Sequence, residues 1–152
     1  MHIKWYTNVP GTTADQAMAR KDTPMEQERT SHAVVQAHKQ AVSTPLNELV
    51  SALQARLSRR ITAYIAGVDN VKTVTRWASG EVATVRDHEM EQKLRTAYEV
   101  FLLLTNYDSV NTVKAWFIGL NPQLGDVAPI DALREGRLRE TLSAARAFTV
   151  GG

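Results

Sequence analysis

Apolar residues recur every three or four positions along most of this chain, which is the spacing of one face of an amphipathic helix. The alternation of apolar and polar residues that would indicate strands is nearly absent. The spacing is clearest in two stretches, with apolar positions Leu46, Leu49, Val50, Leu53 and Leu57 in the first and Leu94, Ala97, Tyr98, Phe101 and Leu104 in the second. The pattern therefore predicts an all-α protein.

Residues that start and stop helices divide this pattern into short helices joined by tight turns. Gly67 and Gly80 each end a helix, and Pro129 opens the last one, which Gly136 interrupts and can split in two. The first 25 residues show little periodicity, and we expect them to form a loosely ordered arm. The predicted helices span residues 24–42, 46–57, 58–66, 70–79, 87–104, 109–118 and 129–148. Three of them have two candidate starting residues: Asp69 or Asn70, Asp87 or Glu89, and Ser109 or Asn111.

Composition limits the size and the chemistry of the protein. The 152 residues are 43% apolar and 22% charged, which is typical of one ordinary globular domain or two very small ones. There are no cysteines, so disulfides, thiolate metal sites and cysteine nucleophiles are excluded. No apolar run approaches the roughly 20 residues that span a bilayer, and the N-terminus has no signal-peptide core. We expect a cytoplasmic protein with no membrane contact.

The charge of the chain is uneven. Residues 46–86 contain six basic and three acidic residues, a net charge of +3, whereas residues 87–152 contain seven basic and nine acidic residues, a net charge of −2. A basic middle favours contact with nucleic acid there. The stretch from Arg56 to Glu81 agrees with this, because two short helices joined by a turn at Gly67 describe a helix-turn-helix.

The second helix of such a unit can enter the major groove of DNA, where Arg reads guanine and hydroxyl groups contact bases or phosphates. Val71, Val74 and Trp77 are expected to pack inward, which leaves the polar residues of this helix on its other face. Arg86 and the two arginines that open the first helix are expected near the phosphates. The predicted DNA-binding residues are Arg59, Arg60, Asn70, Lys72, Thr73, Thr75 and Arg76.

A second informative group of residues lies between Val113 and Gly136. Trp116 and Phe117 close an apolar helix, and we expect both rings in the core because they bury large areas. Asn121 opens a turn in which its side chain can cap a helix or satisfy a loop group. The residues predicted to form an exposed charged face after this turn are Arg134, Glu135, Arg137, Arg139 and Glu140.

Two parts of the sequence resemble known families. The segment "KTVTRWASGE", residues 72–81, resembles the end of the recognition unit of Xre-type (Cro/repressor-like) DNA-binding proteins. The later stretch resembles the C-terminal toxin-binding domain of the antitoxin Xre/MbcA/ParS family, and the helix "KLRTAYEVFLLL" resembles that family's linking helix. The resemblance covers about residues 46–152, and its ordered features are Trp116-Phe117, Leu120-Asn121-Pro122, Leu124, Pro129, Leu133 and Gly136.

The resemblance implies a function. Antitoxins of this family pair with RES-domain toxins, which consume NAD or use it for ADP-ribosylation, and their C-terminal region covers or enters the toxin's active site. The last two glycines have no Cβ to obstruct a narrow cleft, although chain ends are commonly frayed and inert. The implied toxin-binding residues are Asn121, Arg134, Arg137, Phe148, Thr149, Val150, Gly151 and Gly152.

Catalysis is not indicated by any group of residues in the sequence. The chain has no glycine-rich phosphate loop and no His-Glu-x-x-His motif. Ser58 and Ser143 have no evident base partner. The four histidines do not cluster at metal-binding spacings; they are His2, His32, His38 and His88. We therefore expect a protein that is not an enzyme and has no catalytic residues, metal or cofactor.

The sequence thus predicts three parts: residues 1–45 without an assigned role, a helix-turn-helix region at 46–86, and a linking helix with a C-terminal toxin-binding region at 87–152. We expect a homodimeric antitoxin that neutralises a RES-like toxin and represses its operon by binding duplex operator DNA. Two alternatives stay open. One is a stand-alone regulator whose C-terminal part dimerises. The other is an adaptor that lost DNA binding, because Gly67 to Trp77 is one residue longer than the Xre-type unit.

Overall fold

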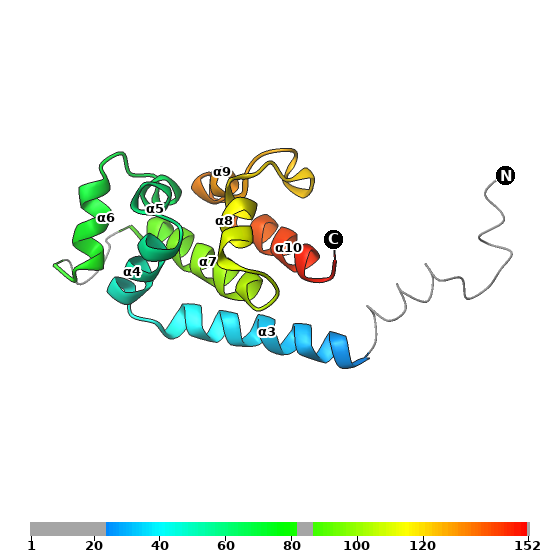
Figure 1. The fold of residues 1–152 in the computed structure, drawn as a ribbon. Coiled ribbons are helices and arrows are strands. Elements are labelled where there is room, and N and C mark those ends of the chain that lie inside the picture. Colours follow the sequence, from blue (N-terminus) through cyan, green and yellow to red (C-terminus); the bar gives the residue numbers. More distant parts are fainter. Residues whose placement is uncertain (1–23, 82–86, 152) are drawn as a thin grey trace, which may run out of the picture.

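The computed structural model describes residues 24–81 and 87–151, which form an all-α fold (Figure 1). The predicted fold class is confirmed. Within these residues the only extended pairing is an isolated bridge between Asn121 and Val127. In chain order the elements are α3 (Pro24–Ser43), α4 (Leu46–Arg56), α5 (Arg59–Ala66), α6 (Val71–Ala78), α7 (His88–Thr105), α8 (Val110–Ile118), the short 3-10 helix η1 (Pro122–Leu124), α9 (Pro129–Arg134) and α10 (Leu138–Thr149).

The N-caps of four helices settle where those helices begin. The side chains of Asn70, Asp87 and Ser109 each accept a hydrogen bond from a backbone N–H of the helix that follows, and Ser58 does the same for α5. The first N–H groups of a helix have no intrahelical partner, so a short polar side chain at this position stabilises the helix start. The open alternatives for the three helix starts are resolved in favour of Asn70, Asp87 and Ser109.

The predicted last helix is divided in two. α9 ends at Arg134, and Gly136 adopts a φ of +85° before α10 begins at Leu138. This left-handed backbone favours glycine, because a Cβ is unfavourable there. The division lets α9 pack against α5 while α10 packs against α7.

α7 lies at the centre of the molecule, and α3, α4, α5, α9 and α10 all pack against it (Figure 1). Its side chains Leu94, Val100 and Leu104 are fully buried. They belong to one large hydrophobic cluster that extends from Ala37 on α3 to Ala145 on α10. The helix-turn-helix region and the C-terminal region therefore share a core.

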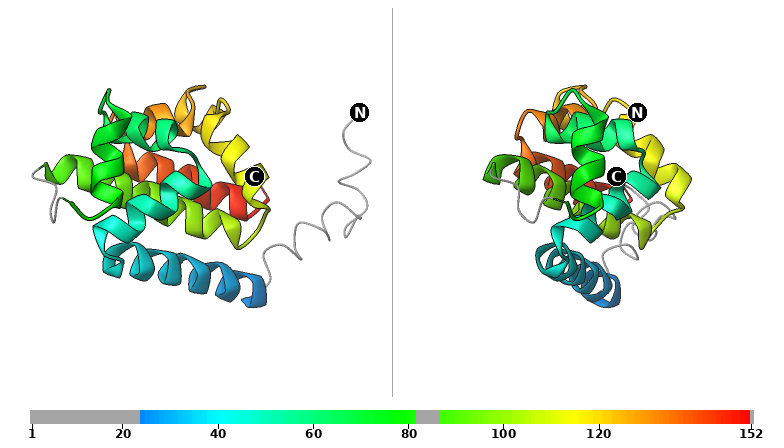
Figure 2. Two further views of the ribbon diagram at one scale, coloured as in Figure 1. Left: turned by 60° about the vertical axis from the view of Figure 1, so that its left-hand side comes forward. Right: turned by 90° about the vertical axis from the view of Figure 1, so that its left-hand side faces the viewer.

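α3 lies along one side of the molecule, with the other helices on its inner side (Figure 2). Its C-terminal half is held firmly: Ala41 is fully buried, and His38 Nδ1 lies 3.1 Å from Glu99 Oε1 on α7. Arg95 Nη1 on α7 donates to the carbonyl oxygens of Ala41 and Thr44, each at 2.8 Å. α3 is thus a fixed part of the described fold.

Two further sequence-based predictions concern contact with a membrane and the N-terminal arm. Among the described helices, none has the length and apolar character that crossing a bilayer requires. Of the N-terminal arm expected over residues 1–25, only Pro24 and Met25 are described, and these two residues already belong to α3. The rest of that expectation lies outside the described residues.

Candidate functional site

The corner formed by α5 and α6 has the form of a helix-turn-helix. α4, α5 and α6 pack on one another, and Gly67 ends α5 with a φ of +81°. On α6, Val74 is fully buried, Trp77 is buried and Val71 is partly buried. The predicted inward face of α6 is confirmed, so its polar residues occupy the other side of the helix.

Two of the predicted DNA-binding residues, Asn70 and Thr75, have local roles on α6, and Thr73 is partly buried there. Asn70 is the N-cap, and its Oδ1 accepts the N–H of Lys72 at 2.9 Å. Thr73 is half-buried. Thr75 is half-buried too, and its hydroxyl donates to the Val71 carbonyl oxygen at 3.2 Å. Asn70 stabilises the start of the helix, and any contact of Asn70 or Thr75 with DNA would have to use their remaining hydrogen-bonding capacity.

Lys72 and Arg76 are the exposed basic residues of α6. Arg76 Nε donates to Glu81 Oε2 at 3.0 Å, and both side chains are exposed. A salt bridge between exposed side chains contributes little, typically about 0–1 kcal/mol, so a phosphate or a base could replace Glu81 at low cost. Lys72 and Arg76 are therefore the strongest candidates on α6 for a contact with DNA.

Arg59 and Arg60 are exposed in the first turn of α5. The first turns of α5 and α6 contain no acidic residue, whereas the first turn of α7 contains Glu89 and Glu91. A helix N-terminus carries a partial positive charge, so basic residues are unfavourable there and a bound anion such as phosphate is favourable. The arginines of α5 are placed where an anionic ligand would offset this repulsion. Arg86 lies outside the described residues.

The predicted turn after α8 forms a compact corner that η1 and α9 continue. Asn121 Oδ1 accepts the N–H of Gln123 at 2.9 Å, and the Asn121 N–H donates to the Val127 carbonyl oxygen at 3.0 Å. Gly125 ends η1 with a φ of +75°. Asn121, which was predicted to bind toxin, therefore also holds this corner in shape.

The two aromatic residues at the end of α8 differ in burial. Phe117 is fully buried, which confirms its predicted place in the core. Trp116 is half-buried and lies edge-to-face against Phe117, with ring centroids 5.5 Å apart and an interplanar angle of 89°. Trp116 also lies edge-to-face against Phe148 on α10, with ring centroids 6.5 Å apart and an interplanar angle of 67°. Trp116 thus connects the core to the end of α10.

Phe148 and Thr149, two of the implied toxin-binding residues, lie within α10 and not beyond its end. Both residues belong to the last turn of α10 and are half-buried, so neither is part of a displayed tail. Phe148 is held by its contact with Trp116, and the Thr149 hydroxyl donates to the Arg146 carbonyl oxygen at 2.7 Å. Aromatic packing and this local hydrogen bond extend the helix through both positions.

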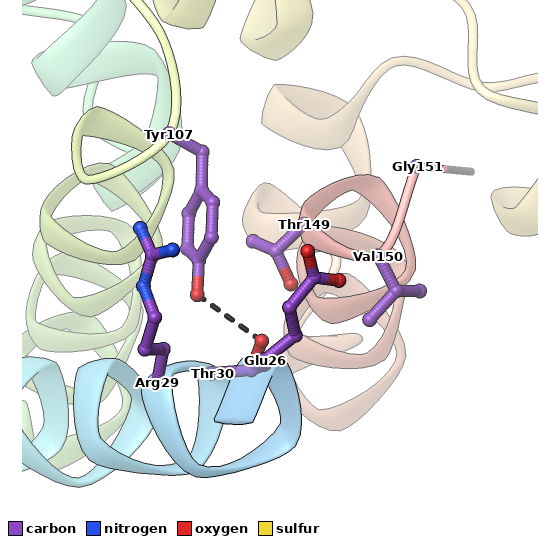
Figure 3. A pocket seen from close by; sticks show the side chains of 7 residues that line it. All are labelled: Glu26, Arg29, Thr30, Tyr107, Thr149, Val150 and Gly151. Carbon is purple, nitrogen blue, oxygen red and sulfur yellow. Dashed lines mark hydrogen bonds between the residues drawn. The ribbon is translucent and has the colours of Figure 1, made fainter. Parts of the chain in front are cut away.

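The segment after α10 begins at Val150, which is 55% exposed, and Gly151 adopts a φ of +87°. Gly152 lies outside the described residues. A hollow of about 280 Å³ lies beside this segment, between the first turns of α3 and the end of α10 (Figure 3). The Tyr107 hydroxyl donates to Thr30 Oγ1 at 3.3 Å within it. Its lining consists of Glu26, Arg29, Thr30, Tyr107, Thr149, Val150 and Gly151.

Arg134 joins α9 to α5. Its Nη1 donates to the Tyr64 carbonyl oxygen at 2.8 Å, and its guanidinium lies 4.5 Å from the centroid of the Tyr64 ring. Its Nη2 also lies 3.9 Å from Asp69 Oδ1, and the Tyr64 hydroxyl donates to Asp131 Oδ1. The hydrogen bond to Asp131, followed by desolvation, raises the pKa of Tyr64 above its ordinary value. We name Tyr64, Asp69, Asp131 and Arg134 the α5–α9 bridge.

This bridge was not predicted from the sequence. The sequence pattern placed Arg134 on an exposed charged face and assigned no role to Tyr64. Tyr64 and Asp131 are 67 residues apart in the chain, and no local pattern brings them together. The sequence offered one indication of such a contact, which is the residue types. Tyr and Arg side chains commonly stack on each other and form hydrogen bonds at the same site.

Arg137 is likewise engaged within the chain. Its Nη2 donates to the Leu124 carbonyl oxygen at 3.1 Å and to Glu140 Oε2 at 2.7 Å. Its Nη1 lies 3.7 Å from Glu135 Oε1. The hydrogen bond from Arg137 lowers the pKa of Glu140, and the same bond raises the pKa of Arg137. This predicted toxin-binding residue therefore links η1 to α10 as well.

An apolar surface lies on the C-terminal corner. Ile118 is 52% exposed and Leu120 is 75% exposed, on either side of Gly119, which ends α8. Leu120 also lines a hollow of about 440 Å³, together with Trp116, Asn121, Pro122, Gln123, Ala144 and Phe148. The sequence analysis did not assign this surface. The sequence feature that indicates this surface is a pair of large apolar residues on either side of a glycine that ends a helix, a place where side chains are incompletely buried.

The described residues contain no group of three or more His, Asp or Glu side chains that could hold a metal ion. In comparisons with known proteins, the chain has no significant match to a family model, a curated protein or a solved structure. Two surfaces are therefore the candidate functional sites of the described residues: the α5–α6 corner with its exposed basic residues, and the C-terminal corner with its exposed apolar residues.

Proposed function

We propose that this chain is the antitoxin of a type II toxin–antitoxin system. It neutralises a RES-like, NAD-consuming toxin with its C-terminal region and represses its own operon through the α5–α6 corner. The observation that carries the proposal is the ordered corner from Trp116 to Gly136, which resembles the toxin-binding domain of the antitoxin Xre/MbcA/ParS family, in a chain that also has a helix-turn-helix corner.

The surface chemistry of the C-terminal corner supports a protein partner. Exposed apolar residues that gather beside a hollow are typical of protein-binding surfaces. Ile118, Leu120 and the hollow beside Trp116 form such a surface, and Val150 after α10 is exposed as well. The proposed toxin would bury these residues, and the segment that begins at Val150 would lie at or within its active-site cleft.

The direct test is purification of the tagged chain from its native host, with identification of the proteins and DNA that remain bound. The proposal expects a stoichiometric partner whose NAD-consuming activity falls when this chain is added. Duplex DNA without any protein partner would instead favour a stand-alone regulator, which uses the same α5–α6 corner. Absence of salt-dependent binding to duplex DNA, with a protein partner present, would favour the adaptor.

Removing residues 150–152 is expected to weaken neutralisation about tenfold, a loss of about 1.4 kcal/mol of binding free energy. The cut leaves α10 intact, because that helix ends at Thr149. Neutralisation is measured as the concentration of the chain that halves the NAD-consuming activity of the toxin. Thermal unfolding serves as the control for the fold. Unchanged neutralisation would exclude this segment from the mechanism.

Replacing Arg76 by Ala is expected to lower affinity for operator DNA by about 1–3 kcal/mol if Arg76 reads a base. The affinity is measured by fluorescence anisotropy with duplex DNA from upstream of the gene, at fixed salt concentration. The matched control is Arg139→Ala, which removes the same charge from an exposed position on α10. Equal losses for the two variants would reduce the effect to net charge, and no loss would mean that Arg76 makes no contact with DNA.

A further inference from the structure

α3 has two faces of different character. The inner face packs on α7 through buried Ala37 and Ala41. The outer face lies on the opposite side of α3 from α7, and its N-terminal part borders an open hollow that Asn106 and Tyr107 also line (Figure 2). Its residues are all exposed and are spaced alternately by three and four positions: Met25, Glu28, His32, Val35, Lys39 and Val42.

This spacing is that of the a and d positions of a coiled coil over six successive places. Three of the six residues are large and apolar, and they are strongly exposed: Met25 by 72%, Val35 by 52% and Val42 by 60%. Exposing them to water is unfavourable by about 25 cal/mol for each Å² of apolar surface. An outer face of this kind is suited to pairing with a second helix.

We propose that the occupant of this face is α3 of a second copy of the chain, packed antiparallel around a twofold axis. In an antiparallel coiled coil an a position packs opposite a d position. Here that register places Met25 opposite the second copy's Val42, Glu28 opposite its Lys39, and His32 opposite its Val35. Each pair occurs twice by symmetry, because a twofold interface uses the same patch on both copies.

Charge selects the antiparallel orientation over the parallel one. A parallel pair would place Glu28 opposite Glu28 and Lys39 opposite Lys39 of the two copies. Like charges that face each other across an interface are destabilising, whereas complementary charges suppress wrong arrangements and fix the register. Only the antiparallel arrangement turns the two charged layers into ion pairs and also brings the apolar Met25 and Val42 together.

The proposed contact between the two α3 helices is short, but each helix is already formed in the single chain. From residue 25 to residue 42 an α-helix rises about 26 Å. An isolated helix of this length is marginal in water, because ordering it has a large entropic cost. Here Arg95, through its hydrogen bonds to Ala41 and Thr44, fixes the C-terminal end of α3 on α7 before any dimer forms. The second copy therefore meets a helix that is ordered in advance.

The test is sedimentation equilibrium of the full chain carrying charge-reversal substitutions on α3. Lys39→Glu alone and Glu28→Lys alone each create two facing like-charge pairs, so each is expected to raise the dissociation constant of the dimer about tenfold or more. The double variant, E28K with K39E, restores both ion pairs and is expected to return the constant to within about threefold of the wild-type value. The matched control is Arg139→Glu, which makes the same change of charge as Lys39→Glu on exposed α10.

Cysteine cross-linking supplies a second readout, because the chain has no cysteine of its own. The double variant Glu28→Cys with Lys39→Cys should form an intermolecular disulfide with oxidised glutathione. Neither single variant should do so, since identical positions of the two copies lie about 16 Å apart in this register, beyond the reach of a disulfide. A wild-type chain that stays monomeric throughout the micromolar range would overturn the inference. So would single variants that cross-link, or charge variants without rescue.

This inference does not depend on the proposed function. The experiments above use the chain alone, without toxin or DNA. Loss of self-association in the single charge variants, with rescue in the double variant, would support it even if no toxin exists.

Discussion

Replacing Phe117 by Ala is expected to lower the free energy of unfolding by about 3–5 kcal/mol. The side chain is fully buried at the end of α8 and lies against Trp116, so its removal takes away the burial of a whole ring and leaves a cavity. A small domain has a total stability of about 5–15 kcal/mol, so this loss would remove about a fifth of that stability or more. Urea denaturation followed by circular dichroism measures the change.

The matched control is Ile118→Ala at the next position. Ile118 is 52% exposed, and its truncation is expected to change stability by no more than about 0.5 kcal/mol. If Ile118 contributes to a toxin-binding surface, this variant would fold normally and lose affinity for the toxin. A stability loss for Ile118→Ala as large as that for Phe117→Ala would contradict the burial assigned to the two residues.

The second large loss of stability is expected from Arg95→Leu, at about 2–4 kcal/mol. α3 has no basic residue in its last turn, and Arg95 of α7 supplies one by donating to the Ala41 and Thr44 carbonyl oxygens at 2.8 Å. It also donates to Glu91 Oε2 at 2.8 Å. Leu has a similar bulk but no donor, so these acceptors at the end of α3 and the Glu91 carboxylate would lose their partner.

Arg139→Leu is the control for this second variant, because Arg139 is exposed on α10. We expect its effect on the free energy of unfolding to stay within about 0.5 kcal/mol in urea denaturation. Similar effects of the two substitutions would show that Arg95 does not anchor α3. A loss confined to Arg95→Leu would show that it does, and self-association of the variant should then weaken as well, because α3 would no longer be held in place.

Sequence reasoning predicted the helices because local chemistry determines where they start and stop. Asn70, Asp87 and Ser109 each satisfy a backbone N–H within two or three residues of themselves, and Gly136 divides the last helix through its own backbone conformation. The buried stripe of α4 follows from the 3.6-residue period alone. Interactions between residues that are close in the chain can therefore be predicted from the sequence.

Interactions between distant helices were not predicted. The hydrogen bond from Tyr64 to Asp131 and the contact of Arg95 with Ala41 depend on how α5 meets α9 and how α7 meets α3. Neither geometry is encoded in a window of neighbouring residues. For the same reason the contact of Phe148 with Trp116 on α8 was not predicted, although the predicted helix included Phe148. The DNA-binding and toxin-binding assignments remain predictions.

The α5–α9 bridge has a consequence for how such chains diversify. Many regulators acquire new partners by exchanging one domain for another at a flexible junction, which requires that each half fold independently. Here α5 packs on both α7 and α9, and Arg134 binds the backbone of Tyr64 directly. A recombinant chain that kept residues 46–86 and received a foreign C-terminal region would leave α5 without the surfaces of α7 and α9 that match it. If the exposed corner at Ile118 and Leu120 is the partner-binding surface, new specificity is more accessible through point substitutions there than through exchange of whole regions.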